Sequence, residues 1–296
     1  MSRASKLGLG TVQWGLDYGI SNQYGQTPLP EILSLLKAAR DKGIAILDTA
    51  PAYGDAELAM GQAGVDGFRV VTKTLPVRAL GGVTVSDVDK IHETFNTSLE
   101  KMGVAAVYGL LVHHADNLLA PGGERVWNLL QELQSLNKAE KIGVSVYRPE
   151  QMERILESFP VDLVQLPFNL YDQRFARTGL LRQLAQAGVE IHARSAFLQG
   201  LLLMEAERLP VPFDAIREHH GRLHQACRDA GLSMLAASLR FCLEEKDIHT
   251  VVVGAENMTQ FTEILDAVES DTALPASLDD FAVEDISIIN PSLWPK

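Results

Sequence analysis

The feature that most constrains the fold is a regular alternation of short apolar runs with longer amphipathic segments. Short runs rich in Val, Ile and Leu are typical of strands buried on both faces of a parallel sheet, and the amphipathic segments are typical of helices that cover it. The eight expected strands are residues 7–11, 44–47, 68–72, 107–112, 141–146, 162–166, 189–193 and 250–253. The expected helices are residues 31–42, 57–62, 86–102 (with Ser86 as N-cap), 124–138, 149–158, 176–187, 213–230, 233–245 and 258–268.

Two α/β architectures contain eight strands that alternate with helices: an open, doubly wound sheet and a closed barrel. The open sheet that binds dinucleotides carries Gly-x-Gly-x-x-Gly where a strand runs into a helix. Here Gly8 and Gly10 are followed by Gln13 in the third place, and we expect no helix to open there. Polar residues also stand at the ends of nearly all the strands rather than at one switch point. We therefore predict a single (β/α)₈ TIM barrel over residues 1–296, with an irregular C-terminal tail from about residue 269.

Composition narrows the class of protein. The apolar fraction of 46% and the charged fraction of 22% are ordinary for a globular chain. A net charge of −12 argues against a nucleic-acid partner, which requires a basic face. The first residues lack the apolar core of a secretion signal, and no apolar stretch is long enough for a membrane span. We expect a cytoplasmic protein without nucleic-acid or membrane partners, and the sequence carries no signal for an oligomeric state.

Four polar residues stand at or just beyond the C-terminal ends of three consecutive expected strands: Asp48, Tyr53, Lys73 and His113. In a closed parallel barrel these ends converge on one face. A phenol has a pKa near ~10, which an adjacent ammonium lowers, while a carboxylate holds the ammonium in place. Such a phenol can exchange a proton with a carbonyl or alcohol oxygen, and a histidine can orient that oxygen. Hydride would have to come from a cofactor.

Each of these residues alone has an ordinary explanation as a turn, packing or solvated residue, but their combination at one rim is hard to explain that way. Two other kinds of site would use some of the same residues. His113, His114 and His192 with Asp48 would suit a metal-dependent hydrolase, but the first strand lacks His-x-His and no open three-ligand pattern is present. Lys73 would suit a Schiff base, as in barrel aldolases. We expect no metal site.

A second group of histidines lies in one expected helix. His219, His220 and His224 fall within residues 213–230, and the last two are one helical turn apart. We interpret them as a solvated helix face rather than as metal ligands. Cys227 and Cys242 match no metal or disulfide pattern and are expected to be buried thiols.

The catalytic motif resembles that of the aldo-keto reductase family over roughly residues 7–265. Asp48-Thr49-Ala50 leading to Tyr53-Gly54 is similar to the family's Asp…Tyr-Gly signature, and Val71-Thr72-Lys73 is similar to its lysine strand. Residues 110–116 are similar to the strand that ends in His-x-x-Asp, which selects His113 over His114. The resemblance implies that Tyr53 is the general acid, that Lys73 and Asp48 tune it, and that His113 orients the substrate carbonyl. It also implies a nicotinamide cofactor across the mouth of the barrel.

The resemblance extends to a set of cofactor positions. It implies that Gly10 and Thr11 lie beside the nicotinamide, that Ser145 and Gln165 bind the carboxamide, followed by Asn169, and that a loop after the seventh strand grips the pyrophosphate. The implied cofactor-binding residues are Gly10, Thr11, Asp48, Ser145, Gln165, Arg194, Ser195, Leu198, Gly200, Gly254, Glu256 and Gln260.

Several residues depart from the family pattern. Val146 replaces a frequent Asn, and Arg194 stands where many members stack an aromatic ring on the nicotinamide, a role that a guanidinium plane can also fill. After the eighth strand, Glu256 stands in a region where NADPH-specific members have basic residues, and Ile264 where an Asn often meets the adenine. A carboxylate would repel a 2′-phosphate but would bind ribose hydroxyls. The resemblance to the family favours NADPH as the cofactor, whereas Glu256 makes NADH an alternative.

We therefore predict an NAD(P)-dependent oxidoreductase that interconverts an aldehyde or ketone and an alcohol on a small molecule. The alternative is a non-catalytic protein that senses the cofactor on the same barrel, as the resemblance to potassium-channel β subunits allows. Expected substrate-binding residues are Trp14, Tyr18, Tyr53 and His113, with contributions from Tyr24, residues 171–174 and the C-terminal tail. Polar and aromatic residues in the first loop suggest a sugar-like or other small aldehyde.

Overall fold

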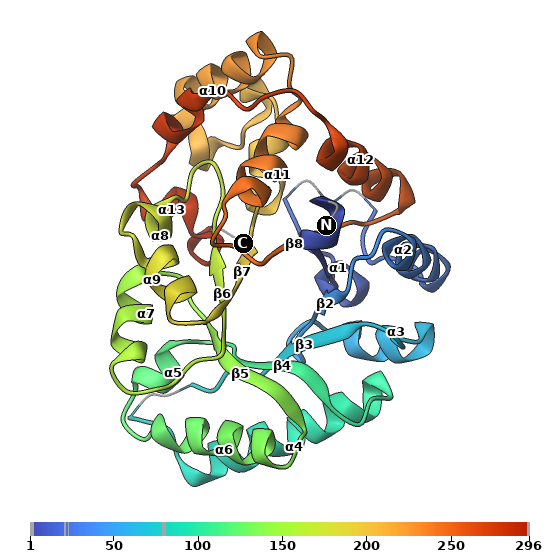
Figure 1. Ribbon diagram of the computed structural model, residues 1–296, viewed down its shortest axis with the longest axis vertical. Coiled ribbons are helices and arrows are strands. Elements are labelled where there is room, and N and C mark those ends of the chain that lie inside the picture. The colour runs from blue at the N-terminus through green and yellow to red at the C-terminus, as the bar shows by residue number, and fades with distance from the viewer. Residues whose placement is uncertain (1–2, 21, 23, 79–80, 295–296) are drawn as a thin grey trace.

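A computed structural model describes residues 3–20, 22, 24–78 and 81–294. Eight parallel strands form a closed barrel in sequence order, and β8 closes it by pairing with β1 (Figure 1). The strands are β1 Leu7–Gly10, β2 Ile46–Asp48, β3 Arg69–Lys73, β4 Val107–Val112, β5 Ala139–Ser145, β6 Leu163–Pro167, β7 Glu190–Arg194 and β8 Thr250–Gly254. The predicted (β/α)₈ TIM barrel is confirmed, with each expected strand within two residues of its observed bounds.

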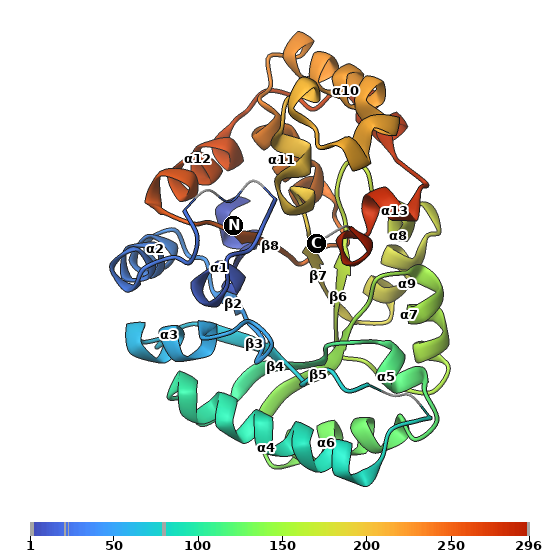
Figure 2. The same ribbon diagram turned by 180° about the vertical axis from the view of Figure 1, so that it is seen from behind.

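Helices form the outer ring of the barrel in both views of the ribbon (Figures 1 and 2). They are α1 Val12–Gly15, α2 Leu29–Asp41, α3 Ala56–Ala63, α4 Val85–Met102, α5 Asp116–Leu119, α6 Glu124–Ser135, α7 Pro149–Leu156, α8 Arg174–Arg177, α9 Leu180–Gln186, α10 Arg217–Asp229, α11 Met234–Glu244, α12 Met258–Glu269 and α13 Ile286–Ile289.

Three local expectations for the helices were wrong. Thr84, not Ser86, caps α4: its Oγ1 accepts a hydrogen bond from the Asp87 amide, and the Asp87 carboxylate accepts one from the Thr84 amide. This reciprocal pair satisfies two amides that the helix start leaves free. The expected helix over 176–187 is two helices, α8 and α9, because Gly179 adopts a left-handed φ of 76° between them. A single helical turn, α1, does open after β1.

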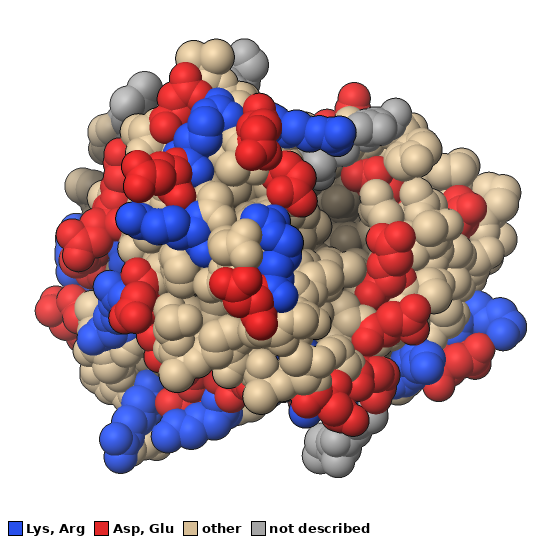
Figure 3. All heavy atoms as spheres, turned by 90° about the horizontal axis from the view of Figure 1, so that it is seen from above, with Lys and Arg blue, Asp and Glu red and all other residues tan. Residues whose placement is uncertain are grey.

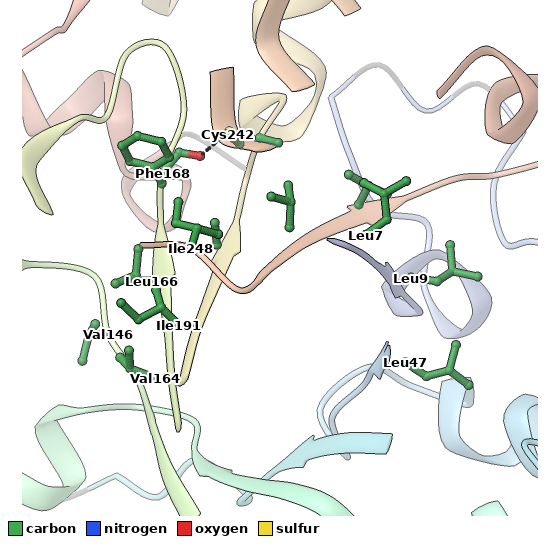
Figure 4. Close-up of a cluster of buried hydrophobic side chains, with 14 of the residues drawn as sticks. Leu7, Leu9, Leu47, Val146, Val164, Leu166, Phe168, Ile191, Cys242 and Ile248 are labelled. Atoms are coloured by element: carbon green, nitrogen blue, oxygen red, sulfur yellow. Dashed lines mark hydrogen bonds between the residues drawn. The ribbon is translucent and has the colours of Figure 1, made fainter. Parts of the chain in front are cut away.

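The core has two layers, one inside the barrel and one between the barrel and the helices. The inner cluster consists of Ile46, Val71, Tyr108, Leu111 and Leu163. Figure 4 shows part of the outer layer, where strand residues such as Leu7, Leu9, Leu47, Val164 and Ile191 carry their side chains. Space inside the barrel is tight at Gly143, where a Cβ atom would lie 1.7 Å from the backbone oxygen of Leu163. A glycine is therefore required there for β5 and β6 to pair.

The segment that follows α12 contains only short helical turns: η5 Ala276–Phe281, α13 and η6 Pro291–Leu293. It packs on the loop after β6, because the Val283 amide donates to the Tyr171 oxygen at 2.9 Å and the Gln173 side chain donates to the Leu278 oxygen at 3.3 Å. Tyr171 and Asp172 are fully buried, and Arg174 pairs with Asp172. These residues of the 171–174 segment lie outside the cavity described below, so their expected contact with substrate is not supported.

The face in Figure 3 carries acidic and basic side chains interspersed with one another. No helix within the described residues is both long and apolar enough to cross a membrane.

Candidate active site

The closed barrel brings Asp48, Lys73, Tyr53 and His113 together. Asp48 and Lys73 are the last residues of β2 and β3, His113 directly follows β4, and Tyr53 lies in the turn after β2. The Lys73 ammonium donates to both carboxylate oxygens of Asp48 at 2.9 Å and to the backbone oxygen of Thr49 at 2.8 Å. Both side chains are almost completely buried, at 1% and 7% exposure. Burial alone would lower the pKa of Lys73, but the Asp48 carboxylate raises it above its usual value.

Tyr53 is half-buried, and its ring is in contact with both neighbours. The Lys73 ammonium lies 5.0 Å from the ring centroid, and the His113 ring meets the phenol edge-on at a centroid distance of 5.9 Å. The expected effect of Lys73, which is to lower the pKa of the phenol, is present, but it is smaller than the effect of burial. Burial raises the pKa of Tyr53, and the opposing charge of Lys73 only partly offsets this, because Asp48 acts in the same direction as burial. The phenol of the free protein is therefore protonated and ready to donate.

His113 is neutral in this site. Burial, together with the charges of Lys73 and Arg194 and the neighbouring His114, lowers the pKa of His113 to about 2. Its Nδ1 atom is buried and has no hydrogen-bond partner among the described residues. A neutral imidazole can donate one hydrogen bond to a substrate oxygen without delivering a charge.

Gln165 and Thr11 hold Asp48 from two sides. The Gln165 amide donates to Asp48 Oδ1 at 2.6 Å, and the Thr11 hydroxyl donates to the Asp48 backbone oxygen at 3.0 Å. Strand register brings Thr11 next to Asp48, because β1 pairs Gly10 with Asp48. Gln165, expected only as a cofactor contact, thus also positions the carboxylate that holds Lys73, and Thr11 fixes the backbone of Asp48.

One cavity of about 670 Å³ extends from this site across the C-terminal ends of β5 to β8. Tyr53, His113 and Tyr18 line it together with most of the expected cofactor positions, namely Gly10, Thr11, Asp48, Ser145, Gln165, Arg194, Ser195, Gly200, Gly254, Glu256 and Gln260. Residues from sequence positions more than 200 apart therefore line the same cavity.

Two expected site residues do not face this cavity. Trp14 is fully buried in the hydrophobic core within α1, so the expectation that it contacts substrate was wrong. Leu198 is also fully buried and packs in the core. Its contribution is to the path of the backbone, since its amide donates to the Ser195 oxygen at 2.9 Å.

The loop after β7 has an unusual backbone. Ser195, Leu198 and Gln199 have left-handed φ values of 63°, 49° and 54°, which is uncommon for residues with a side chain. Asn169 supports the loop by donating to the Ser195 oxygen at 3.0 Å. Strained backbone of this kind gathers at sites that clamp ligands.

Tyr18, in the first loop of the chain, contacts the same loop after β7. The Gln199 side chain donates to the Tyr18 hydroxyl at 3.0 Å, so the first loop and the loop after β7 are bridged. Burial, followed by the charge of Tyr53, raises the pKa of Tyr18 to about 12. Tyr24 is 72% exposed and is not part of the cavity lining.

The far end of the cavity, after β8, is acidic. Glu256 exchanges two hydrogen bonds with Gln260: its amide donates to Gln260 Oε1 at 3.0 Å, and Gln260 Nε2 donates to its carboxylate at 3.1 Å. Burial and the charge of Asp17 raise the pKa of Glu256. Glu263 also lines this end.

The cavity lining also includes residues that the sequence does not single out as site residues, among them Gln13, Tyr147 and Gln199. In the sequence Gln13 only interrupts a glycine motif, yet in the structure a Cβ atom at Gly254 would lie 2.6 Å from its side-chain oxygen. The Tyr147 ring carries the Arg194 guanidinium at 4.2 Å. Because Tyr147 and Arg194 are far apart in the sequence, no local sequence pattern predicts this pairing.

The histidines of α10 do not form a solvated face, as had been expected. His220 and His224 are 0% and 3% exposed, and their Nε2 atoms bond to the backbone oxygens of Met204 and Leu202 at 2.7 and 3.0 Å. His219 bonds to the Phe281 oxygen at 3.1 Å. The reason is tertiary, because the chain after β7 and the C-terminal segment both pack on α10. Within the described chain, no three His, Cys, Asp or Glu side chains are grouped as metal ligands would be.

Several known proteins resemble this chain in sequence. The sequence pattern of the Aldo/keto reductase family matches residues 6–279. The chain is 24% identical over 293 residues to L-glyceraldehyde 3-phosphate reductase of Escherichia coli O157:H7, covering 86% of this chain and 84% of that protein. It is 29% identical over 185 residues to aldo-keto reductase YhdN of Bacillus subtilis (strain 168), covering 60% of this chain and about half, 54%, of that relative.

A solved structure shares the fold. The holo form of aldo-keto reductase AKR11C1 from Bacillus halodurans superposes with a TM-score of 0.71 at 20% identity, over 93% of this chain and 90% of that chain. With the family pattern matched over most of its length, this chain belongs to the aldo/keto reductase family of oxidoreductases.

Proposed function

We propose that this oxidoreductase interconverts a small aldehyde or ketone and the corresponding alcohol, using a nicotinamide dinucleotide and Tyr53 as the proton donor and acceptor. The observation that carries the proposal is the buried Asp48–Lys73 pair beside the Tyr53 ring, with a neutral His113 at the same cavity wall. A carbonyl oxygen between Tyr53 and His113 would receive a proton from the first and a hydrogen bond from the second.

The raised pKa of Tyr53 suits the direction of reduction. A protonated phenol is the form that a general acid needs, and Lys73 stabilises the phenolate left after proton transfer. Asp48 keeps Lys73 charged and in place. For oxidation the same groups act in reverse order.

The Schiff-base alternative for Lys73 has little support. A Schiff-base lysine needs a neutral amine and a lowered pKa. Here the pKa of Lys73 is raised, and its ammonium is held by Asp48 and the Thr49 oxygen.

The cavity lining fits a nicotinamide dinucleotide. Gln13 Oε1 is buried without a partner among the described residues and faces the space that a Cβ at Gly254 would fill. Ser145 and Gln165 would hold the carboxamide, and the strained loop with Ser195 and Gly200 would hold the pyrophosphate. When bound, such a dinucleotide supplies or accepts hydride.

The adenosine end supports NADH more than the NADPH that family habit favours. Glu256 and Glu263 line this end, and Asp17 adds to its negative charge. A carboxylate there can accept hydrogen bonds from ribose hydroxyls and repels a phosphate on the same ribose. Arg228 and Glu205 also line the cavity, and they lie 3.6 Å apart, so the carboxylate offsets the charge of the guanidinium.

Tyr18, Tyr53 and His113 remain the proposed substrate contacts, and the proposed substrates are small aldehydes, sugar-like ones among them. The relative named L-glyceraldehyde 3-phosphate reductase acts on a substrate of this size. The test is oxidation of NADH and NADPH, each with a panel of sugar, aliphatic and aromatic aldehydes. Turnover of simple aromatic aldehydes without any sugar would exclude the sugar hypothesis. Tight dinucleotide binding without any turnover would favour the cofactor-sensing alternative.

A further inference from the structure

We propose that Arg194 is an anion-binding residue at the catalytic end of the cavity. The substrate would then carry a carboxylate or a phosphate on the same carbon chain as its carbonyl group. This inference rests on the proposed carbonyl reduction at Tyr53. It adds to that proposal the chemical class of the substrate.

The first observation is that Arg194 has no counter-ion. It is the last residue of β7, is half-buried and lines the cavity. No carboxylate of the described residues forms an ion pair with it. A partly desolvated guanidinium without a counter-ion is unfavourable unless something else compensates it. The chain has an excess of acidic residues, with a net charge of −12, so the missing counter-ion does not reflect a shortage of carboxylates.

The second observation is that the guanidinium is held in one orientation. One face lies 4.2 Å from the centroid of the Tyr147 ring, and one N–H donates to the Val146 oxygen at 3.0 Å. A weaker contact reaches the Ser195 hydroxyl at 3.4 Å. The remaining N–H groups have no acceptor among the described residues. A fixed planar fork with free donors matches the geometry of a carboxylate or phosphate.

The third observation concerns the charges around Arg194. Asp48 is the acidic residue at this end, and Lys73 neutralises it at 2.9 Å. His113 is neutral, so the positive charge of Arg194 is not cancelled locally. That charge acts on the pKa of Tyr53, Tyr18 and His113, which places it near the reacting groups. The acidic residues Glu256 and Glu263 lie towards the adenosine end of the cavity, and neither of them forms an ion pair with Arg194.

Steady-state kinetics with matched substrate pairs test the proposal. Succinic semialdehyde is compared with butanal for the carboxylate, and glyceraldehyde 3-phosphate with glyceraldehyde for the phosphate. We expect wild-type kcat/KM to favour the charged member of at least one pair by on the order of 10- to 100-fold, as a charge-assisted hydrogen bond allows. The preferred pair identifies the anion. In Arg194→Gln the ratio of kcat/KM between the charged and the neutral member of the pair should fall to about one, and in Arg194→Lys part of the preference should return.

The control is Arg222→Met, which removes one positive charge from an exposed position on α10 without touching the cavity. It should keep the wild-type preference, which rules out a general effect of net charge. The affinity for NADH and NADPH is measured separately by fluorescence titration. If wild type shows no preference for anions, or if Arg194→Gln lowers both members of a pair equally together with dinucleotide affinity, the proposal is overturned.

A binding experiment separates this proposal from the proposed reaction. Calorimetric titration with 4-hydroxybutyrate and glycerol 3-phosphate, with oxidised dinucleotide present, requires no turnover. Binding of at least one of them to wild type but not to Arg194→Gln would support the anion site even if no aldehyde were reduced. Equal binding to both proteins, or binding to neither, would overturn it.

Discussion

The ammonium of Lys73 is equidistant, at 2.9 Å, from the two carboxylate oxygens of Asp48, and both side chains are almost completely buried. This pair is the electrostatic support of the proposed acid Tyr53. It is also a structural element, because removing one member leaves the other charge buried alone.

Lys73→Met is expected to remove turnover and to weaken the fold. Turnover should fall by at least on the order of 10²-fold, because the phenolate loses its stabilising charge. The free energy of unfolding should fall by about 3–5 kcal/mol, because Asp48 is left unpaired. Denaturant unfolding and kcat/KM measure the two effects.

The double variant Lys73→Met with Asp48→Asn separates these effects. It should recover most of the lost unfolding free energy but none of the turnover. Recovery of turnover in the double variant would show that Lys73 acts only through the fold.

Tyr53→Phe is expected to lower kcat by roughly 10²- to 10⁴-fold while dinucleotide affinity is retained, because only the exchangeable proton is removed. Tyr24→Phe, at an exposed position, is the matched control and should behave as wild type.

The raised pKa of Tyr53 has a further consequence: reduction should be lost only as pH rises beyond about 10, since the acid form persists until then. A decline in the rate of reduction that begins near neutral pH and is assigned to Tyr53 would contradict the assignment.

Glu256→Gln is expected to raise the affinity for NADPH relative to NADH by roughly fivefold, because a carboxylate near the ribose is removed. Glu218→Gln, whose side chain is 91% exposed on α10, removes the same charge elsewhere and should leave the ratio unchanged. The two dissociation constants are measured by fluorescence titration. An unchanged ratio in Glu256→Gln would place this residue away from the ribose.

His220 is expected to make stability depend on pH. Burial lowers the pKa of His220 to about 4 from an ordinary 6.5. The unfolded chain therefore binds a proton at a higher pH than the folded chain does. Stability is full above about 6.5 and is lost as pH falls towards about 4, by roughly 3 kcal/mol. Unfolding of His220→Gln across this range should show a shallower slope, whereas exposed His92→Gln should keep the wild-type slope.

Much of the fold follows from local sequence. The apolar runs predict all eight strands, because a strand that is buried on both faces is apolar throughout, whichever strands it pairs with. In any closed parallel barrel the C-terminal ends of the strands converge on one face. That convergence is why Asp48, Lys73 and His113 could be grouped from the sequence alone. Their proton chemistry was less predictable, because the pKa of Tyr53 depends on burial more than on its neighbour Lys73.

Other features depend on contacts between distant segments. Trp14 looked like a loop residue, but the single turn of α1 directs it into the core. His220 and His224 are buried because carbonyl groups of a separate segment reach them. The sequence of α10 alone does not show which backbone oxygens these histidines bond to, because those oxygens belong to another segment.

The clearest example is Glu190, which no sequence pattern singled out as part of a network. At the first residue of β7, its carboxylate accepts hydrogen bonds from Tyr108 at 2.6 Å, from His192 at 2.7 Å and from Lys141. Although burial alone would raise it, these bonds hold the pKa of Glu190 well below its usual value. The three partners come from β4, β5 and β7, so only the closed barrel brings them together.

Glu190→Gln is expected to lower the free energy of unfolding by about 2–3 kcal/mol, less than for a fully buried pair because Lys141 is 29% exposed. Because Glu190 begins β7 while Arg194 ends it, the network lies away from the catalytic end, and kcat/KM of the folded protein should stay within about twofold of wild type. Adding Lys141→Met should restore part of the stability, since the leftover charge is removed. A large loss of kcat/KM with unchanged stability would show instead that the network serves the active site rather than the barrel.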